Sequence, residues 1–154
     1  MNSSLSKKPG RLGLWDRLRH RFRHLRWQPD RASGRLAEDI AHRYLEGLGY
    51  IVVARNYLAR GGDGELDLVA RDGDTLVVVE VKSRSTGDFG PPELAVTSEK
   101  RRKVIRTAFE FARRSHVPDT ALRFDIVSVI HGMPPEVTHF RDAFGYHSSA
   151  SYNR

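Results

Sequence analysis

Three carboxylates and one ammonium group near the end of a predicted β-hairpin could form a site for a divalent cation. Two runs rich in valine and leucine, 64–70 and 75–82, flank the dipeptide Asp72-Gly73, and such a dipeptide between apolar runs predicts a two-residue hairpin turn. Side chains alternate along a strand, so one face of this hairpin is expected to carry Glu65, Asp67, Glu80 and Lys82.

The predicted register decides how close these acids come. With Asp72-Gly73 as the loop, Glu65 is expected opposite Glu80, and Asp67 is a diagonal neighbour at about 7 to 8 Å between backbones. Mg²⁺ takes carboxylate oxygens at about 2.0 to 2.1 Å and keeps several waters, so two acids on adjacent strands suffice to anchor it. The other face of the hairpin is expected to lie in the core with Leu66, Leu68, Ala70, Val77, Val79 and Val81.

The alternative is a polar strand end whose acids are solvated or paired with surface arginines. The unbroken apolar run from Leu76 to Val79 argues against it, because an exposed strand should alternate along its whole length. We therefore favour a metal site, in which Lys82 would position a bound water or stabilise a developing oxyanion.

The charge of the chain is concentrated at its N-terminus. The 154 residues carry a formal charge of +7, and one ordinary domain has about this length. Residues 1–30 hold eight Lys or Arg against two Asp, a net +6, whereas residues 31–154 hold 18 against 17 acids, a net +1. Such asymmetry predicts binding to a polyanion. The absence of cysteine and of a signal-peptide or membrane-spanning run predicts a cytoplasmic protein without stable membrane insertion.

Residues 1–30 are predicted to form a basic arm with an amphipathic helix. Trp15, Leu18, Phe22 and Leu25 recur three or four residues apart, with arginines such as Arg17 and Arg21 between them. The arm is expected to clamp nucleic acid; docking on an anionic membrane surface and packing on its own domain stay open as alternatives. Residues 31–144 are expected to form a single folded domain, and residues 145–154 a disordered tail.

A first helix is predicted from Ser33, as N-cap, to Leu48, with Gly49 after its end. Its buried arc is expected to contain Ala37, Ile40, Ala41, Tyr44, Leu45 and Leu48. Glu38 falls about 20° from Leu45 on a helical wheel and could point along the sheet towards Asp67 and Glu80. The alternative is an acid placed near a helix N-terminus by the helix dipole.

A second helix is predicted from Thr97 or Ser98 to about Arg114, and its first turns are strongly basic. Cations near a helix N-terminus oppose the dipole, so the cluster favours a phosphate-binding surface over a merely solvated face. Arg84 lies in a polar segment beside the acids and is expected to contact the same phosphate groups. The cluster consists of Lys100, Arg101, Arg102, Lys103 and Arg106.

Further strands are predicted at 50–54 and 122–130, with 136–140 as an edge strand. The order becomes αβββαβ, an α/β fold in which a mixed sheet is flanked by helices.

These residues resemble the motif of the PD-(D/E)xK nuclease superfamily, in which Asp67 is followed after twelve residues by Glu80-x-Lys82 and is preceded by a helix carrying Glu38. The core motif is also similar to that of archaeal-type Holliday junction resolvases. More narrowly, four segments over about residues 31–142 resemble the YraN-like family of small bacterial proteins, which is grouped with endonucleases. These segments are Gly34-Arg35-Leu36-Ala37-Glu38, Gly64-Glu65-Leu66-Asp67, Val79-Glu80-Val81-Lys82-Ser83-Arg84 and Arg123-Phe124-Asp125.

The resemblance implies a restriction-endonuclease-like core and a nuclease that depends on Mg²⁺ or Mn²⁺. It adds Glu38 to the metal ligands Asp67 and Glu80, with Glu65 supporting them, and it implies a nucleic-acid substrate, with DNA expected rather than RNA. A homodimer stays open. The alternative is a non-catalytic nucleic-acid-binding protein on a nuclease-like scaffold, and the intact set of Asp67, Glu80 and Lys82 argues against it.

Overall fold

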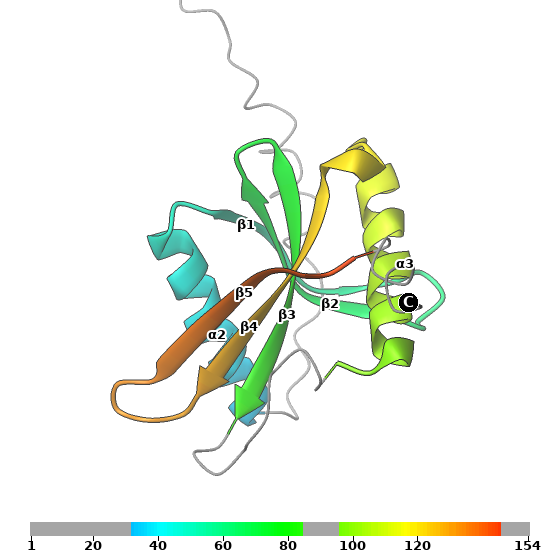
Figure 1. The fold of residues 1–154 in the computed structure, drawn as a ribbon. Coiled ribbons are helices and arrows are strands. Elements are labelled where there is room, and N and C mark those ends of the chain that lie inside the picture. The colour runs from blue at the N-terminus through cyan, green and yellow to red at the C-terminus, as the bar shows by residue number, and fades with distance from the viewer. Residues whose placement is uncertain (1–31, 85–95, 146–154) are drawn as a thin grey trace, which may run out of the picture.

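A five-stranded mixed sheet lies between two helices in the computed structural model, which describes residues 32–84 and 96–145 (Figure 1). The strands are ordered as in the chain, with β3 and β4 parallel and the other pairs antiparallel. The elements are α2 (Ala32–Gly47), β1 (Ile51–Leu58), β2 (Glu65–Asp72), β3 (Thr75–Arg84), α3 (Ser98–Arg114), a 3₁₀ turn η2 (Asp119–Ala121), β4 (Leu122–Ile130) and β5 (Glu136–Phe144).

This order confirms the predicted α/β class and the αβββαβ core, to which β5 is added as an edge strand. The predicted amphipathic helix with Arg17 and Arg21, the segment after Arg84 and the chain beyond Gly145 lie outside the described residues. Within the described part, no helix is long and apolar enough to cross a membrane.

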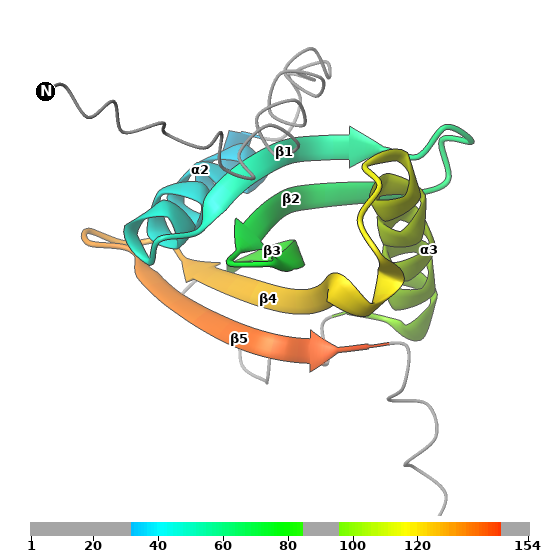
Figure 2. The same cartoon turned by 90° about the horizontal axis from the view of Figure 1, so that it is seen from above.

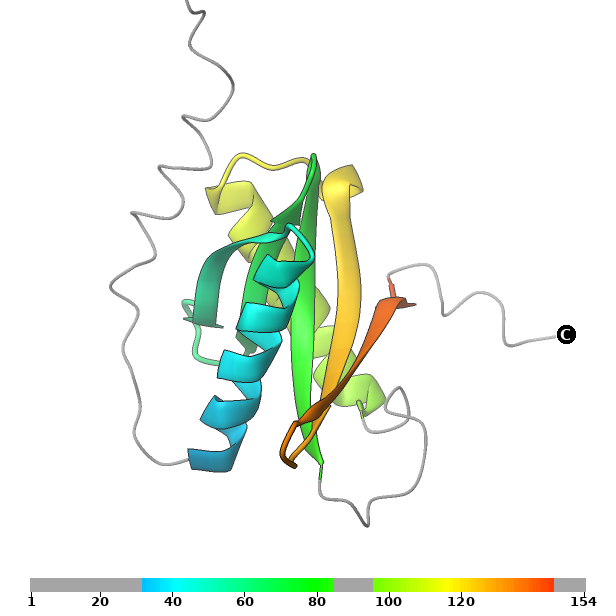
Figure 3. The same cartoon turned by 90° about the vertical axis from the view of Figure 1, so that its left-hand side faces the viewer.

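The two helices cover opposite faces of the sheet (Figures 2 and 3). On the α2 face, Ala37, Ala41 and Leu45 pack against Leu68 and Val79 among others. On the α3 face, residues of α3 such as Phe111 pack against β1 to β4. Burying one large apolar side chain stabilises a protein by about 1.5 to 3 kcal/mol. Both faces of β3 are therefore core, which explains why its sequence does not alternate.

The ends of the first helix differ slightly from the prediction. The helix begins at Ala32, so Ser33 lies in its first turn instead of preceding it, and it ends at Gly47. Gly49 has a positive φ of 89°, as expected of the residue after a helix. Leu48 is 53% exposed rather than buried, because it belongs to this turn and no longer follows the helical face.

The hairpin register is the main correction. Asp72 pairs with Thr75 and Leu68 with Val79, so the loop is Gly73-Asp74 and the pairing is shifted by two residues from the prediction. Gly73 has a φ of 60° and, as the first loop residue, supplies the positive φ that a type II′ turn needs there. A shift of two residues preserves the face of every side chain, but it changes which residues are opposite.

Strands β1 and β5 are longer than predicted, and the face predicted for Leu66 was wrong. Leu66 joins the cluster on the α3 face with its β1 partner Tyr57, whereas Leu68 joins the cluster on the α2 face. The alternation of side chains in β2 thus breaks between Leu66 and Leu68. On β1, Asn56 lies between their two partners, and its φ of 48° interrupts the regular conformation of that strand.

Candidate metal centre

Asp67 on β2 and Glu80 on β3 each lie directly beyond the last residue pair of the two strands, and we call these two residues the facing acids. The paired residues run from Asp72 and Thr75 to Leu68 and Val79. The Asp67 carboxylate accepts a hydrogen bond of 2.8 Å from the backbone N–H of Val81. Burial raises the pKa of Asp67 well above its usual range, and the nearby charge of Glu80 raises it further. The two acids thus interact electrostatically across the neighbouring strands.

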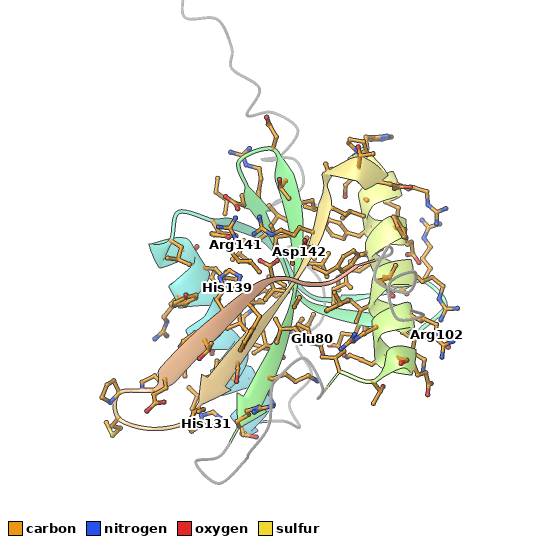
Figure 4. The ribbon with its side chains drawn as sticks, in the orientation of Figure 1. Glu80, Arg102, His131, His139, Arg141 and Asp142 are labelled. Atoms are coloured by element: carbon orange, nitrogen blue, oxygen red, sulfur yellow. The ribbon has the colours of Figure 1, made fainter. Side chains whose placement is uncertain are left out.

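Glu80 is a buried carboxylate with one compensated oxygen. Only 3% of the residue is exposed, and its side chain lies between β3 and α3 (Figure 4). Oε1 is 3.2 Å from Nζ of Lys82 and 3.3 Å from Nζ of Lys100, whereas the buried Oε2 has no hydrogen-bond partner. Such a buried acceptor costs free energy unless it is coordinated, so Oε2 marks a position where a cation would be stabilised.

Lys100 is a partner of Glu80 that the sequence did not reveal, since its place in the basic cluster suggested contact with phosphate alone. It lies in the first turn of α3, where the side chain of Thr97 accepts a hydrogen bond of 3.2 Å from its backbone N–H. Although burial alone lowers the pKa of Lys100, the carboxylates of Glu80, Asp67 and Glu65 raise it overall. Lys100 therefore stays protonated among the acids.

Glu38 lies at the edge of the α2 face, as predicted, and is held by residues of β1. Oε2 accepts a hydrogen bond of 3.1 Å from Asn56 and is 3.9 Å from the guanidinium of Arg55. Burial raises the pKa of Glu38, and its charge contributes to the raised pKa of Asp67. Glu65 is exposed at the start of β2. Both acids therefore belong to the negative field of the site.

A divalent cation fits the two facing carboxylates better than the full predicted set of four acids. Among the described residues, no three carboxylate, imidazole or thiolate groups surround a single point. Mg²⁺ is usually bound by one or two carboxylates and several waters, a requirement that Asp67 and Glu80 meet. Roles for Glu38 and Glu65 in binding the ion stay predictions.

The basic cluster of α3 is divided among different partners. Arg101 donates a hydrogen bond of 3.0 Å to the carbonyl of Val96 and stacks 5.8 Å from the Phe144 ring centroid. Lys103 is 2.9 Å from Glu99. The two exposed members are Arg102, which Figure 4 shows on the side of α3 away from the sheet, and Arg106. Arg84 ends β3 and is partly buried.

A cleft between the β1–β2 loop and α3 shares Lys100 with the site. It has a volume of about 210 Å³, and two other acids and two lysines line it. Gly64 forms part of its wall, where a Cβ atom would overlap Oγ1 of Thr107. Its lining residues are Leu58, Gly62, Asp63, Gly64, Glu65, Lys100, Lys103 and Val104.

A second polar network lies around Asp125, which is fully buried. Its carboxylate accepts hydrogen bonds from Nε of Arg123 at 2.9 Å and from the backbone N–H of Asp142 at 2.9 Å, and it contacts Nε2 of His139 at 2.8 Å. Arg123 also donates to Asp72 at 2.9 Å. Figure 4 shows His139 and Asp142 on β5. Both carboxylate oxygens of Asp125 thus have hydrogen-bond partners. Because these partners and Asp72 belong to different strands, the network joins β2, β4 and β5.

Comparison with known sequences identifies a family whose match spans these residues. The profile described as "Uncharacterised protein family UPF0102" matches residues 37–129, which include both facing acids and Asp125. A UPF0102 protein of Solibacter usitatus is 49% identical over 133 residues, which cover 86% of this chain and 99% of that relative. A UPF0102 protein of Geobacter metallireducens is 41% identical over 116 residues, which cover 75% of this chain and 93% of that relative. One of Rhodococcus opacus is 43% identical over 115 residues, which cover 73% of this chain and 96% of that relative.

Proposed function

This chain belongs to the uncharacterised protein family UPF0102, the YraN-like group predicted from its motifs, and we propose that it is a divalent-metal-dependent nuclease that hydrolyses phosphodiester bonds. The observation that carries the proposal is the pair Asp67 and Glu80, with a buried, unpartnered Oε2 on Glu80. The names of the relatives state no activity, so the proposal depends on this site.

The facing acids would anchor Mg²⁺ or Mn²⁺, and Glu38 and Glu65 would support the positive charge from farther away. A bound ion supplies a water of lowered pKa and neutralises charge on the phosphate. Lys82 lies 3.2 Å from Glu80 Oε1, where its ammonium group could orient a nucleophilic water or stabilise the negative charge of the pentacoordinate phosphorane.

The substrate backbone would lie across the basic cluster of α3. Arg102 and Arg106 are its exposed members, and exposed cations bind phosphate oxygens without reading the sequence of bases. Arg84 would contact the same backbone, and the basic arm with Arg17 and Arg21 would extend the surface. We expect DNA rather than RNA as the substrate.

Cleavage assays test this proposal. Purified protein should cut at least one member of a panel of linear, single-stranded and branched DNA and RNA when Mg²⁺ or Mn²⁺ is present, and EDTA should stop the reaction. Glu80→Ala and Lys82→Ala should lose cleavage while nucleic-acid binding largely persists. Glu46→Ala is a matched control, because Glu46 is an exposed acid of α2 that pairs with His42.

Two results would contradict the proposal in different ways. Cleavage that continues undiminished in EDTA or in Glu80→Ala would show that this site is not the source of the activity. A folded protein that binds nucleic acid and cuts no member of the panel would favour the non-catalytic binding protein.

A further inference from the structure

We propose that Lys100 partly neutralises Glu80 in the metal-free protein, in the absence of a divalent cation, and that its ammonium group weakens metal binding by competing for the Glu80 carboxylate. This inference rests on the proposed metal site. It assigns to one residue of α3 a role in deciding when the site is loaded, in addition to any contact with phosphate.

The geometry separates Lys100 from Lys82. Lys82 lies two residues after Glu80 on the same strand and is 3.2 Å from its Oε1. Lys100 reaches the same oxygen, at 3.3 Å, from a different element on the α3 face. A buried carboxylate beside another acid is costly without compensation, so a second ammonium group on Glu80 supplies the charge that an ion would otherwise bring.

The other acids near Lys100 strengthen this assignment. The charges of Asp67 and Glu65 act on it together with that of Glu80, and they stabilise its protonated form. Lys103 lies one turn farther along α3 and pairs with Glu99 at 2.9 Å. Of these two neighbouring lysines, therefore, Lys100 is the one held at the proposed metal site.

An ion between Asp67 and Glu80 would repel this ammonium group, so metal binding requires Lys100 to withdraw. The cleft beside the site offers a position for it, since Lys100 lines that cleft together with Asp63 and Glu65. From there its charge would lie beside the loaded site and face an incoming phosphate. A monovalent cation would replace the unit charge of Lys100 by another unit charge, so it would gain little electrostatic free energy. A divalent cation would gain more.

Metal titration tests the inference without any substrate. In calorimetric titrations of the metal-free full chain with Mn²⁺, Lys100→Met should lower the Kd at least about tenfold, because a unit charge beside a dication costs more than 1 kcal/mol even in water. Lys100→Arg should stay near wild type because it keeps the charge. Lys103→Met is the control and should change the Kd less than about twofold, since Lys103 pairs with Glu99 and not with Glu80.

The outcomes distinguish this inference from the proposed function. If wild type binds Mn²⁺ and Lys100→Met binds it equally or more weakly, the inference is wrong and the metal site stands. If wild type and all variants fail to bind Mn²⁺, the metal site itself is refuted, and the inference falls with it. Should Lys100→Met fail to fold, Lys100→Gln removes the same charge with a polar side chain and must shift the Kd in the same direction.

Discussion

At the scale of single residues, the carboxylates of Asp67 and Glu80 have different electrostatic surroundings. Burial raises the pKa of Asp67, and the negative charge of Glu80 raises it further. Glu80 is paired with Lys82 and Lys100 through a single oxygen. A cation between them would relieve the repulsion at Asp67 and coordinate the unpartnered oxygen of Glu80. Both benefits favour metal binding at the same place.

Asp125 provides a test of stability at this scale. Although burial alone raises its pKa, hydrogen bonds from His139, Arg123 and the Asp142 backbone lower the pKa below the ordinary value. A carboxyl group with a lowered pKa stabilises the folded protein fully above its unfolded pKa of about 3.9, and this contribution is lost as the pH falls through the folded pKa.

Asp125→Asn should therefore lower the free energy of unfolding at neutral pH by about 3 to 5 kcal/mol, because the largely buried guanidinium of Arg123 loses its charged partner. The variant should also lose stability less steeply than wild type below about pH 4. Denaturant unfolding across this range measures both effects, with Asp119→Asn, an exposed acid of η2, as control. An acid limb as steep as that of wild type would contradict the assignment.

At the scale of elements, sequence patterns predicted which side chains share a face better than they predicted which residues are partners. Glu80 and Lys82 were placed correctly on one face because alternation depends only on parity. The register was wrong by two residues because the dipeptide Asp72-Gly73 is compatible with more than one two-residue loop. The contact of Lys100 with Glu80 depends on how α3 packs on the sheet, which periodicity within one helix does not specify.

The approach of the β1–β2 loop to α3 can be tested at Gly64. A Cβ atom there would overlap Thr107 Oγ1 and lie 3.3 Å from the Lys103 carbonyl. Gly64→Ala must therefore displace the Thr107 side chain, which donates a hydrogen bond of 2.8 Å to that carbonyl, or α3 itself, and it should cost about 1 to 3 kcal/mol of stability. Gly61→Ala is the control, because nothing lies within 4 Å of its Cβ position. Thermal melts that show equal destabilisation of the two variants would contradict this packing.

At the scale of the whole molecule, the distribution of charge separates the site from the arm. Residues 1–30 contribute a net +6 of the formal +7, whereas the acids of the site lie within the sheet. The candidate site and most of the net positive charge thus belong to different parts of the chain. Composition predicted this division, but the partner of the arm cannot be inferred from charge alone, because nucleic acid and anionic membranes both attract arginine.

Deletion of residues 1–30 should weaken nucleic-acid binding and leave metal-dependent cleavage intact. For every phosphate that the arm neutralises, its deletion should flatten the dependence of log K on log salt by about 0.9, which fluorescence anisotropy at several salt concentrations measures. Binding to anionic vesicles is the parallel assay. If the salt slope is unchanged and only vesicle binding disappears, the arm is a membrane-surface anchor instead.

The most direct test of the proposed metal centre compares thermal melts of wild type and Glu80→Gln in EDTA and in Mn²⁺. Wild type should gain about 2.7 kcal/mol of stability at a Mn²⁺ concentration one hundred times its Kd. Glu80→Gln should gain much less, because one of the two facing carboxylates has lost its charge. No gain in wild type, or an equal gain in both proteins, would contradict a divalent cation held by Asp67 and Glu80.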